Sequence, residues 1–258
     1  IGSVMSVKSK LDKFNFFYEI KSCLELCSKK IIEIYEKDNK EVFYKKDESP
    51  ITKADLASHE IICDCLMSIS SLPIISEESD NFYTQNKTYW LVDPLDGTKE
   101  FINKNGEFTI NIALINDKYP VVGYVYLPVN QTLYAGGLDK GSIKCFNSTI
   151  KEISTSTYQD PVRVVASRNH LNNETKNFIS NLKNYKLYQA GSSIKFCMIA
   201  EGQADVYPRL APTSEWDTAA AQAIVEGAGG SVKDMDDKRL AYQKDNILNP
   251  FFVVRGKE

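Results

Sequence analysis

The chain has 258 residues, of which 43% are hydrophobic and 25% charged, with 31 basic residues against 34 acidic ones. This apolar content allows a buried core and excludes a disordered protein, which carries fewer apolar residues and a larger charge imbalance. The formal net charge of −3 excludes a protein that coats nucleic acid, and no apolar run approaches the roughly 18 residues of a membrane-spanning helix.

The N-terminal part of the chain is predicted to be helical. Residues 1–4, which precede Met5, resemble a cloning remnant more than a signal peptide, because no basic start precedes an apolar stretch. Apolar residues recur every three or four positions between Ile20 and Ile34, which predicts a helix over residues 11–36. A second helix is expected to begin near Thr52 and to carry an apolar face as far as Ile69.

The middle of the chain changes to the pattern of strands. The apolar run 89–92 predicts a buried strand that ends at Asp93-Pro94. Three further β-rich runs, at 109–115, 121–127 and 132–135, are separated by short polar turns. This spacing predicts antiparallel strands connected by hairpins.

After about residue 155 the predicted strands and helices alternate. The strands fall at 162–166, 204–207 and 251–254, and the helices at 173–182, 193–201 and 218–226, the last ended by Gly227, Gly229 and Gly230. We therefore predict an α+β fold with two closely packed domains. Residues 1–155 would form an α+β domain, and residues 156–258 an α/β domain.

The cysteines and histidines leave carboxylates as the better candidates for chemistry. The six cysteines form neither a disulfide framework nor a Cys-x-x-Cys pair, and four of them fall in helical stretches, where cysteine usually serves as a small buried apolar residue. We therefore expect a reducing, cytoplasmic compartment. Only His59 and His170 are available for a zinc site or a Ser-His-Asp triad, so neither is favoured.

The stretch from Asp93 to Thr98, which reads Asp-Pro-Leu-Asp-Gly-Thr, is the most informative of the chain. A buried strand delivers Asp93, and Asp96 follows at the turn, so the two carboxylates can converge on one point. Gly97 permits close backbone approach, and the N–H groups that follow it can face an anion. Two carboxylates beside an anion site are what Mg²⁺ with a phosphate group requires, although Asp, Pro and Gly are also ordinary turn residues.

Three other acidic positions lie at the ends of predicted elements, and each also has a structural interpretation. Glu77 and Glu78 follow an apolar strand, where solvated surface charge fits at least one of them and Glu78 best. Asp217 stands at the head of an Ala-rich helix, where Asp is a good N-cap. Asp55 forms a capping-box variant with Thr52. Acids at four element ends together favour a site over capping alone.

The acid pair after a strand, the Asp-Pro-x-Asp-Gly-Thr motif and the Trp-Asp pair before an Ala-rich helix occur in this order in one superfamily. The chain resembles this lithium-sensitive, Mg²⁺-dependent phosphatase superfamily, which includes the inositol monophosphatases. The finer resemblance is to the CysQ-type 3'(2'),5'-bisphosphate nucleotidases, because Lys99-Glu100-Phe101 stands where inositol monophosphatases usually read Thr-Asn-Phe. Motifs at 105–115, 167–170, 191–196 and 200–205 continue this resemblance, which extends from about residue 49 to residue 252. It implies a layered αβαβα sandwich with an antiparallel N-terminal sheet.

The resemblance also implies roles for individual residues. Two or three Mg²⁺ ions are expected to be held by Glu77, Asp93, Asp96, Asp217 and the backbone carbonyl of Leu95. Asp55 and Thr98 are expected to orient and deprotonate the attacking water. The substrate is expected to contact Gly97, Thr98, His170, Ser192, Lys195 and Arg209. Read from the sequence alone, Lys195 and Arg209 are also consistent with simple surface charges.

The implied activity is hydrolysis of the 3'-phosphate of 3'-phosphoadenosine 5'-phosphate to AMP and phosphate. Water would attack without a covalent intermediate, and lithium would inhibit. The expected partner is this small nucleotide, not a nucleic-acid polymer or a membrane, and the chain is expected to be a monomer or a homodimer. Three alternatives remain open: a phosphatase for inositol monophosphate or a related sugar phosphate, a non-catalytic nucleotide sensor, and a structural or scaffolding protein whose acids serve only as helix caps. Loss of a metal carboxylate would favour the sensor, and none is lost.

Overall fold

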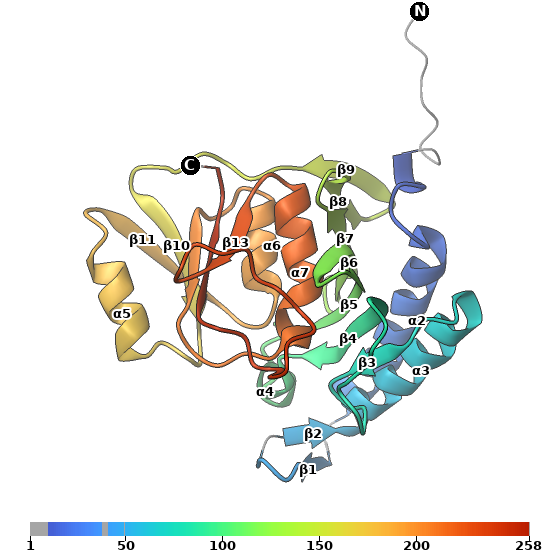
Figure 1. Ribbon diagram of the computed structural model, residues 1–258. Helices are drawn as coiled ribbons and strands as arrows, with labels where there is room; N and C mark the ends of the chain where they lie inside the picture. The colour runs from blue at the N-terminus through green and yellow to red at the C-terminus, as the bar shows by residue number, and fades with distance from the viewer. Residues whose placement is uncertain (1–9, 38–40, 49, 258) are drawn as a thin grey trace, which may run out of the picture.

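The computed structural model describes residues 10–37, 41–48 and 50–257, so the interpretation of residues 1–4 lies outside it. The helices are α2 (Phe17–Tyr35), α3 (Lys53–Ile69), α4 (Thr98–Ile102), α5 (Asn173–Ser180), α6 (Ile194–Ala200) and α7 (Glu215–Gly227). Two large sheets enclose α6 and α7, while α2 and α3 cover the outer face of one sheet and α5 lies outside the other (Figure 1). This five-layer αβαβα arrangement confirms the predicted fold class.

The two outer helices differ in how well their starts were predicted. Helix α3 begins one residue after Thr52, as expected, because the Thr52 side chain caps it. Helix α2 begins at Phe17, not at residue 11. Lys10 and Leu11 are helical, but residues 12–16 form turns and a bend, and Phe16 adopts a left-handed φ of 58°. Leu11 and Phe14 are nevertheless buried. Apolar residues therefore continue to be buried upstream of α2, across a segment, residues 12–16, that interrupts the helical backbone.

The larger sheet has seven strands that follow one another in chain order. They are β3 (Ile74–Ser76), β4 (Thr88–Asp96), β5 (Thr109–Asn116), β6 (Tyr119–Leu127), β7 (Thr132–Gly137), β8 (Gly141–Phe146) and β9 (Thr149–Ile153). The β3–β4 pair is parallel, and all other neighbours are antiparallel. The predicted strands are confirmed, but β8 and β9 were not predicted. β9 lies at an edge and is almost wholly exposed, so its sequence lacks an apolar pattern.

The sequence predicts that strand β4 ends at Asp93-Pro94, and this prediction is wrong. The strand continues to Asp96, and its register against β5 shifts between Asp93 and Asp96. Proline is tolerated inside a sheet at such an irregularity, since it has no N–H to contribute to the ladder. This local shift brings the two carboxylates of the motif to the carboxyl end of one strand.

The smaller sheet is mixed, with the order β11-β10-β12-β14-β13. Its strands are β10 (Val162–Ser167), β11 (Tyr185–Ala190), β12 (Val206–Arg209), β13 (Ser231–Asp234) and β14 (Phe252–Arg255). β10 pairs in parallel with β11 and β12, whereas β14 is antiparallel to both of its neighbours. The chain passes from one sheet to the other near residue 155, but one hydrophobic core contains residues from both. The division into two domains stays a prediction.

Helix α7 lies between the sheets and fixes their separation. A Cβ at Gly123 of β6 would stand 2.0 Å from the Ala220 carbonyl oxygen, so only glycine allows this approach. The helix begins at Glu215, three residues before the predicted start, because Ser214 caps it and Asp217 closes a capping box. Asp217 is therefore the third helical residue, not the N-cap. A small hairpin, β1 (Val42–Tyr44) with β2 (Pro50–Thr52), precedes α3 and lies near α4 (Figure 1).

None of the helices in the described part of the chain is both long enough and apolar enough to span a membrane. The six cysteines are all free, and four of them are buried. Of the four cysteines in the predicted helices, Cys23 and Cys27 are buried as expected, whereas Cys63 and Cys65 are only partly buried.

Candidate active site

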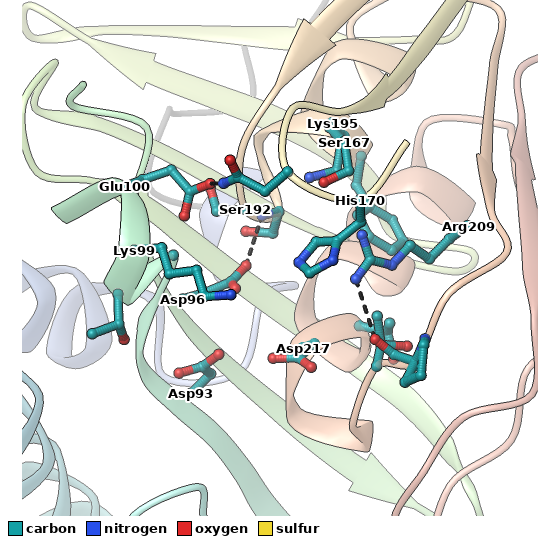
Figure 2. Close-up of a pocket in the computed structure, with 18 of the residues that line it drawn as sticks. Asp93, Asp96, Lys99, Glu100, Ser167, His170, Ser192, Lys195, Arg209 and Asp217 are labelled. Carbon is teal, nitrogen blue, oxygen red and sulfur yellow. Dashed lines mark hydrogen bonds between the residues drawn. The ribbon is translucent and has the colours of Figure 1, made fainter. Parts of the chain in front are cut away.

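A cavity of about 260 Å³ opens where α4, the start of α7 and the carboxyl ends of β4, β10 and β12 meet. Figure 2 shows the carboxylates of Asp93, Asp96 and Asp217 gathered in it, with His170 and Arg209 projecting into the same space. Every residue predicted for the site except Asp55 lines this cavity. The structure thus brings together predicted site residues up to 140 positions apart in the sequence, from Glu77 to Asp217.

Three carboxylates form the centre of the site. Oxygen atoms of Asp93, Asp96 and Asp217 all lie within 4.8 Å of one another. Backbone N–H groups orient each carboxylate: Leu95 donates to Asp93 at 3.2 Å, Ser193 to Asp96 at 2.7 Å, and Ser214 to Asp217 at 2.7 Å. The second oxygen of Asp93, Oδ2, is buried and has no hydrogen-bond partner. Such an orphaned carboxylate oxygen beside two others is the donor set that a hard divalent cation requires.

Burial and mutual repulsion raise the pKa of every acid in this centre. Burial, followed by the neighbouring acids, raises the pKa of Asp93 well above its ordinary value. Burial raises the pKa of Asp96 to about 6, and burial together with Asp96 raises the pKa of Asp217 to about 6. Like charges held this close in a desolvated site are compensated either by bound protons or by a cation. The residues present therefore fit a bound divalent metal ion.

Glu77 adjoins the three aspartates but belongs to a second pairing as well. Burial, followed by the charge of Asp217, raises the Glu77 pKa to about 7. Lys45 lies 2.7 Å from Glu78 Oε1 and 3.4 Å from Glu77 Oε1. The Glu78 side chain is only 6% exposed, so its interpretation as solvated surface charge was wrong. Lys45 was not predicted for the site, because nothing in its polar stretch distinguishes it from a surface lysine.

Asp55 performs two tasks with its two oxygens. Oδ2 accepts hydrogen bonds from the N–H and the hydroxyl of Thr52, at 2.7 and 2.6 Å, and so closes the capping box of α3. Oδ1 accepts the hydroxyl of Thr98 at 2.9 Å. Burial raises the pKa of Asp55, and the bonds from Thr52 and Thr98 oppose this rise. The capping and functional interpretations of Asp55 are therefore compatible.

Gly97 stands at the turn between β4 and α4 with a φ of 89°. A Cβ there would lie 3.0 Å from the Glu107 carbonyl oxygen and 3.3 Å from Cβ of Ser192. A larger residue would therefore be strained and would push apart the segments that close the cavity. Leu95 is buried beneath this turn, and the predicted use of its carbonyl as a metal ligand stays a prediction.

The cations predicted for substrate binding are buried, so their interpretation as surface charges was wrong. Lys195 is 4% exposed and Arg209 is 9% exposed. Burial, followed by the charge of Arg209, lowers the Lys195 pKa to about 8, and burial with the same arginine lowers the His170 pKa to about 4. Arg209 Nε and Ser192 Oγ are buried without hydrogen-bond partners. Orphaned donors beside a buried ammonium group form a cradle for an anion.

This site, held between two sheets, is built to bind a metal ion and an anion side by side. Residues 18–251 match the model of the inositol monophosphatase family. The chain belongs to this family, as the motifs of its sequence predict.

Named relatives refine the comparison. The chain is 43% identical over 220 residues to the 3'(2'),5'-bisphosphate nucleotidase CysQ of Escherichia coli strain K12, which covers 83% of this chain and 88% of the relative. It is 44% identical over 216 residues to the enzyme of the same name from Salmonella typhimurium, covering 81% and 87% of the two chains. The crystal structure of CysQ from Bacteroides thetaiotaomicron matches with a TM-score of 0.81 and 39% identity, covering 93% and 97%. The suhB protein of Bartonella henselae, with a TM-score of 0.76 and 22% identity, shares the fold.

Proposed function

We propose that this protein is a Mg²⁺-dependent 3'(2'),5'-bisphosphate nucleotidase that converts 3'-phosphoadenosine 5'-phosphate to AMP and phosphate. One observation carries the proposal: a cluster of carboxylates and a pair of buried cations line the same cavity. The carboxylates suit a metal-bound phosphate that is to be cleaved. The cations suit a second anionic group of the same substrate, as a bisphosphate has.

Asp93, Asp96 and Asp217, with Glu77 beside them, would hold the metal ions. Mg²⁺ bound there supplies Lewis acidity to the phosphate and increases the acidity of a coordinated water. The protein's own contribution is to fix the ligands, and the backbone N–H groups of Leu95, Ser193 and Ser214 do so. The number of ions, two or three, is part of this proposal.

The Asp55–Thr98 pair would prepare the nucleophile. The Thr98 hydroxyl donates its proton to Asp55, which leaves Thr98 Oγ1 free to accept a hydrogen bond from the attacking water. A proton from that water could then pass through Thr98 to Asp55. Because burial raises the Asp55 pKa, this carboxylate is a better proton acceptor than an exposed aspartate. Gly97 and the start of α4 would approach the phosphate closely, since no side chain intervenes.

Lys195, Arg209, Ser192 and His170 would contact the nucleotide. Lys195 and Arg209 both line the desolvated cavity, and the charge of Arg209 adds to burial in lowering the pKa of Lys195. An anion placed between them would relieve this repulsion. A phosphate does so, whereas the hydroxyls of an inositol ring do not, which favours the bisphosphate over inositol monophosphate.

Phosphate release from a panel of three compounds tests the proposal: 3'-phosphoadenosine 5'-phosphate, inositol 1-phosphate and fructose 1,6-bisphosphate, each with and without Mg²⁺. The adenosine bisphosphate should give the highest kcat/KM, and chelation should stop release. Preferred release from either sugar phosphate would replace the substrate assignment. Binding of the nucleotide without turnover of any compound would favour the sensor. A cytoplasmic location and a monomeric or homodimeric state stay predictions.

A further inference from the structure

Glu107 and Arg168, two residues to which the family resemblance assigns no role, meet beside the cavity. Glu107 lies before β5, and Arg168 follows β10, 61 positions later. The Arg168 guanidinium donates from Nε to Oε2 of Glu107 at 3.3 Å and from Nη2 to Oε1 at 2.9 Å. Two parallel bonds between a planar guanidinium and a carboxylate fix orientation as well as distance. We call this pair, with the contacts of Glu107 described next, the Glu107 clasp.

Glu107 also holds the turn that carries Ser192. Its Oε2 accepts the N–H of Gly191 at 2.8 Å. Ser192 follows in a left-handed conformation, with a φ of 53°, and its buried hydroxyl faces the cavity without a partner. Arg168 donates in addition to the Gln189 carbonyl at 3.2 Å, so the clasp holds the backbone at both Gln189 and Gly191, directly before Ser192.

The neighbouring loop is held from the same side. Asn169 donates through Nδ2 to the buried carboxylate of Glu100. The Glu100 side chain also fills the space beside Gly191, where a Cβ would meet its Cγ at 2.6 Å. His170, the next residue after Asn169, is thereby directed into the cavity. Acids from the α4–β5 region therefore hold both loops that carry predicted nucleotide contacts.

We propose that Glu107 is a positioning residue that sets the Ser192 turn and the Arg168–His170 loop for the nucleotide, and so determines affinity for the bisphosphate. This inference rests on the proposed function. Glu107 acts through other residues, since it does not line the cavity. Its carbonyl oxygen lies 3.0 Å from the position of a Cβ on Gly97, so Glu107 also adjoins the turn expected to hold the scissile phosphate.

The partial exposure of the Glu107–Arg168 pair allows a positioning role to be distinguished from a contribution to folding stability. The Arg168 side chain is 46% exposed and that of Glu107 is 25% exposed. Exposed ion pairs contribute little to folding stability. Removing the clasp should therefore change substrate affinity more than it changes the melting temperature.

The test compares the kinetics of Glu107→Gln with those of wild type. Glutamine keeps the size but loses the charge, so KM for 3'-phosphoadenosine 5'-phosphate should rise about tenfold while kcat stays within about twofold. Arg168→Gln should reproduce this effect. The KM of the double variant should be no higher than the higher of the two single-variant KM values, because both changes remove one shared contact. The Mg²⁺ concentration required for half-maximal activity should be unchanged.

Glu226→Gln is the matched control. Glu226 accepts two bonds from Arg239, at 2.6 and 2.8 Å, in a pair of the same chemistry that does not line the cavity. This variant should keep the wild-type KM. An unchanged KM in Glu107→Gln, or an equal rise in Glu226→Gln, overturns the positioning role.

A second measurement needs no turnover. If wild type releases no phosphate from the bisphosphate, the proposed function fails, and the clasp is then judged by amide hydrogen exchange over residues 189–193. Exchange there should be faster in Glu107→Gln than in wild type and unchanged in Glu226→Gln. Equal exchange in Glu107→Gln and wild type overturns the clasp.

Discussion

The Thr98 hydroxyl donates a 2.9 Å hydrogen bond to Asp55, and this contact joins the first turn of α3 to the first residue of α4. The remaining oxygen of Asp55 is held by Thr52. A carboxylate fixed on one side and bonded to a hydroxyl on the other can take a proton without moving. The sequence explains Asp55 as a helix-capping residue, and the same capping bonds would orient Asp55 as the proposed base.

Thr98→Val should lower kcat by roughly 10²- to 10⁴-fold, the range of general base catalysis, because valine keeps the shape of threonine but cannot relay a proton. The change does not touch the α3 cap, so the melting temperature should stay close to that of wild type. Steady-state kinetics and a thermal melt of the same samples measure both. Thr98→Ser keeps the hydroxyl and should retain most activity. A Thr98→Val enzyme with wild-type kcat would remove the pair from the mechanism.

Asp93→Asn should abolish turnover while the protein stays folded. Asn cannot replace the charge that holds a divalent cation, and Asp93 is the member of the cluster with an orphaned buried oxygen. Without metal the variant should be at least as stable as wild type, because it relieves repulsion among buried acids. Circular dichroism, Mg²⁺ titration calorimetry and phosphate release together check these outcomes. Asp217→Asn should behave in the same way, and full phosphate release by either variant would end the metal assignment.

Local patterns predicted much of the fold and most of the site. The Asp93–Thr98 motif and the acids at element ends are short-range signals, and the structure gathers them in one cavity. The errors came where a long-range contact overrides a local rule. Pro94 stays within β4 because the pairing with β5 absorbs it at a register shift. Glu78 is buried because Lys45, 33 positions earlier, pairs with it.

The sequence also did not predict that Lys195 and Arg209 are buried. Lys195 lies on α6, whose charged residue breaks an otherwise apolar stretch, and a lysine in such a place usually reaches solvent. Here Tyr207 and Arg209 of β12 enclose it, with the ammonium group 5.4 Å from the centre of the Tyr207 ring. The Glu107 clasp escapes prediction for the same reason, since nothing near either residue in the sequence specifies its partner.

The metal-free protein should lose stability as the pH rises from about 4 to about 7. The folded state raises the pKa of Asp96 and Asp217 from 3.8 to about 6 and that of Glu77 from 4.5 to about 7. Protons are therefore bound more tightly in the folded state than in the unfolded state. This stabilisation is complete below the unfolded values and disappears as the pH passes the folded ones.

Thermal melts in chelator across this pH range measure the loss. Saturating Mg²⁺ should reduce it, because the cation replaces the protons as counter-charge. Asp93→Asn should also flatten the profile. A metal-free protein whose melting temperature rises from pH 4 to pH 7 would contradict the raised pKa values.

Lys195→Arg should remove the alkaline decline of kcat/KM. Burial and the neighbouring Arg209 lower the Lys195 pKa to about 8, so the wild-type ammonium loses its proton as the pH rises through that value. The free enzyme then loses a cation that the proposed function assigns to the nucleotide, and kcat/KM for the bisphosphate should fall above about pH 8. Arginine stays protonated throughout, so its profile should be flat there, although the larger group will lower the maximum.

Profiles of kcat/KM at constant free Mg²⁺ from pH 6.5 to about 9.5 compare the two enzymes, with circular dichroism to show that both stay folded. Equal alkaline limbs in the two enzymes would show that another group titrates, and Lys195 would then lose its place in substrate binding.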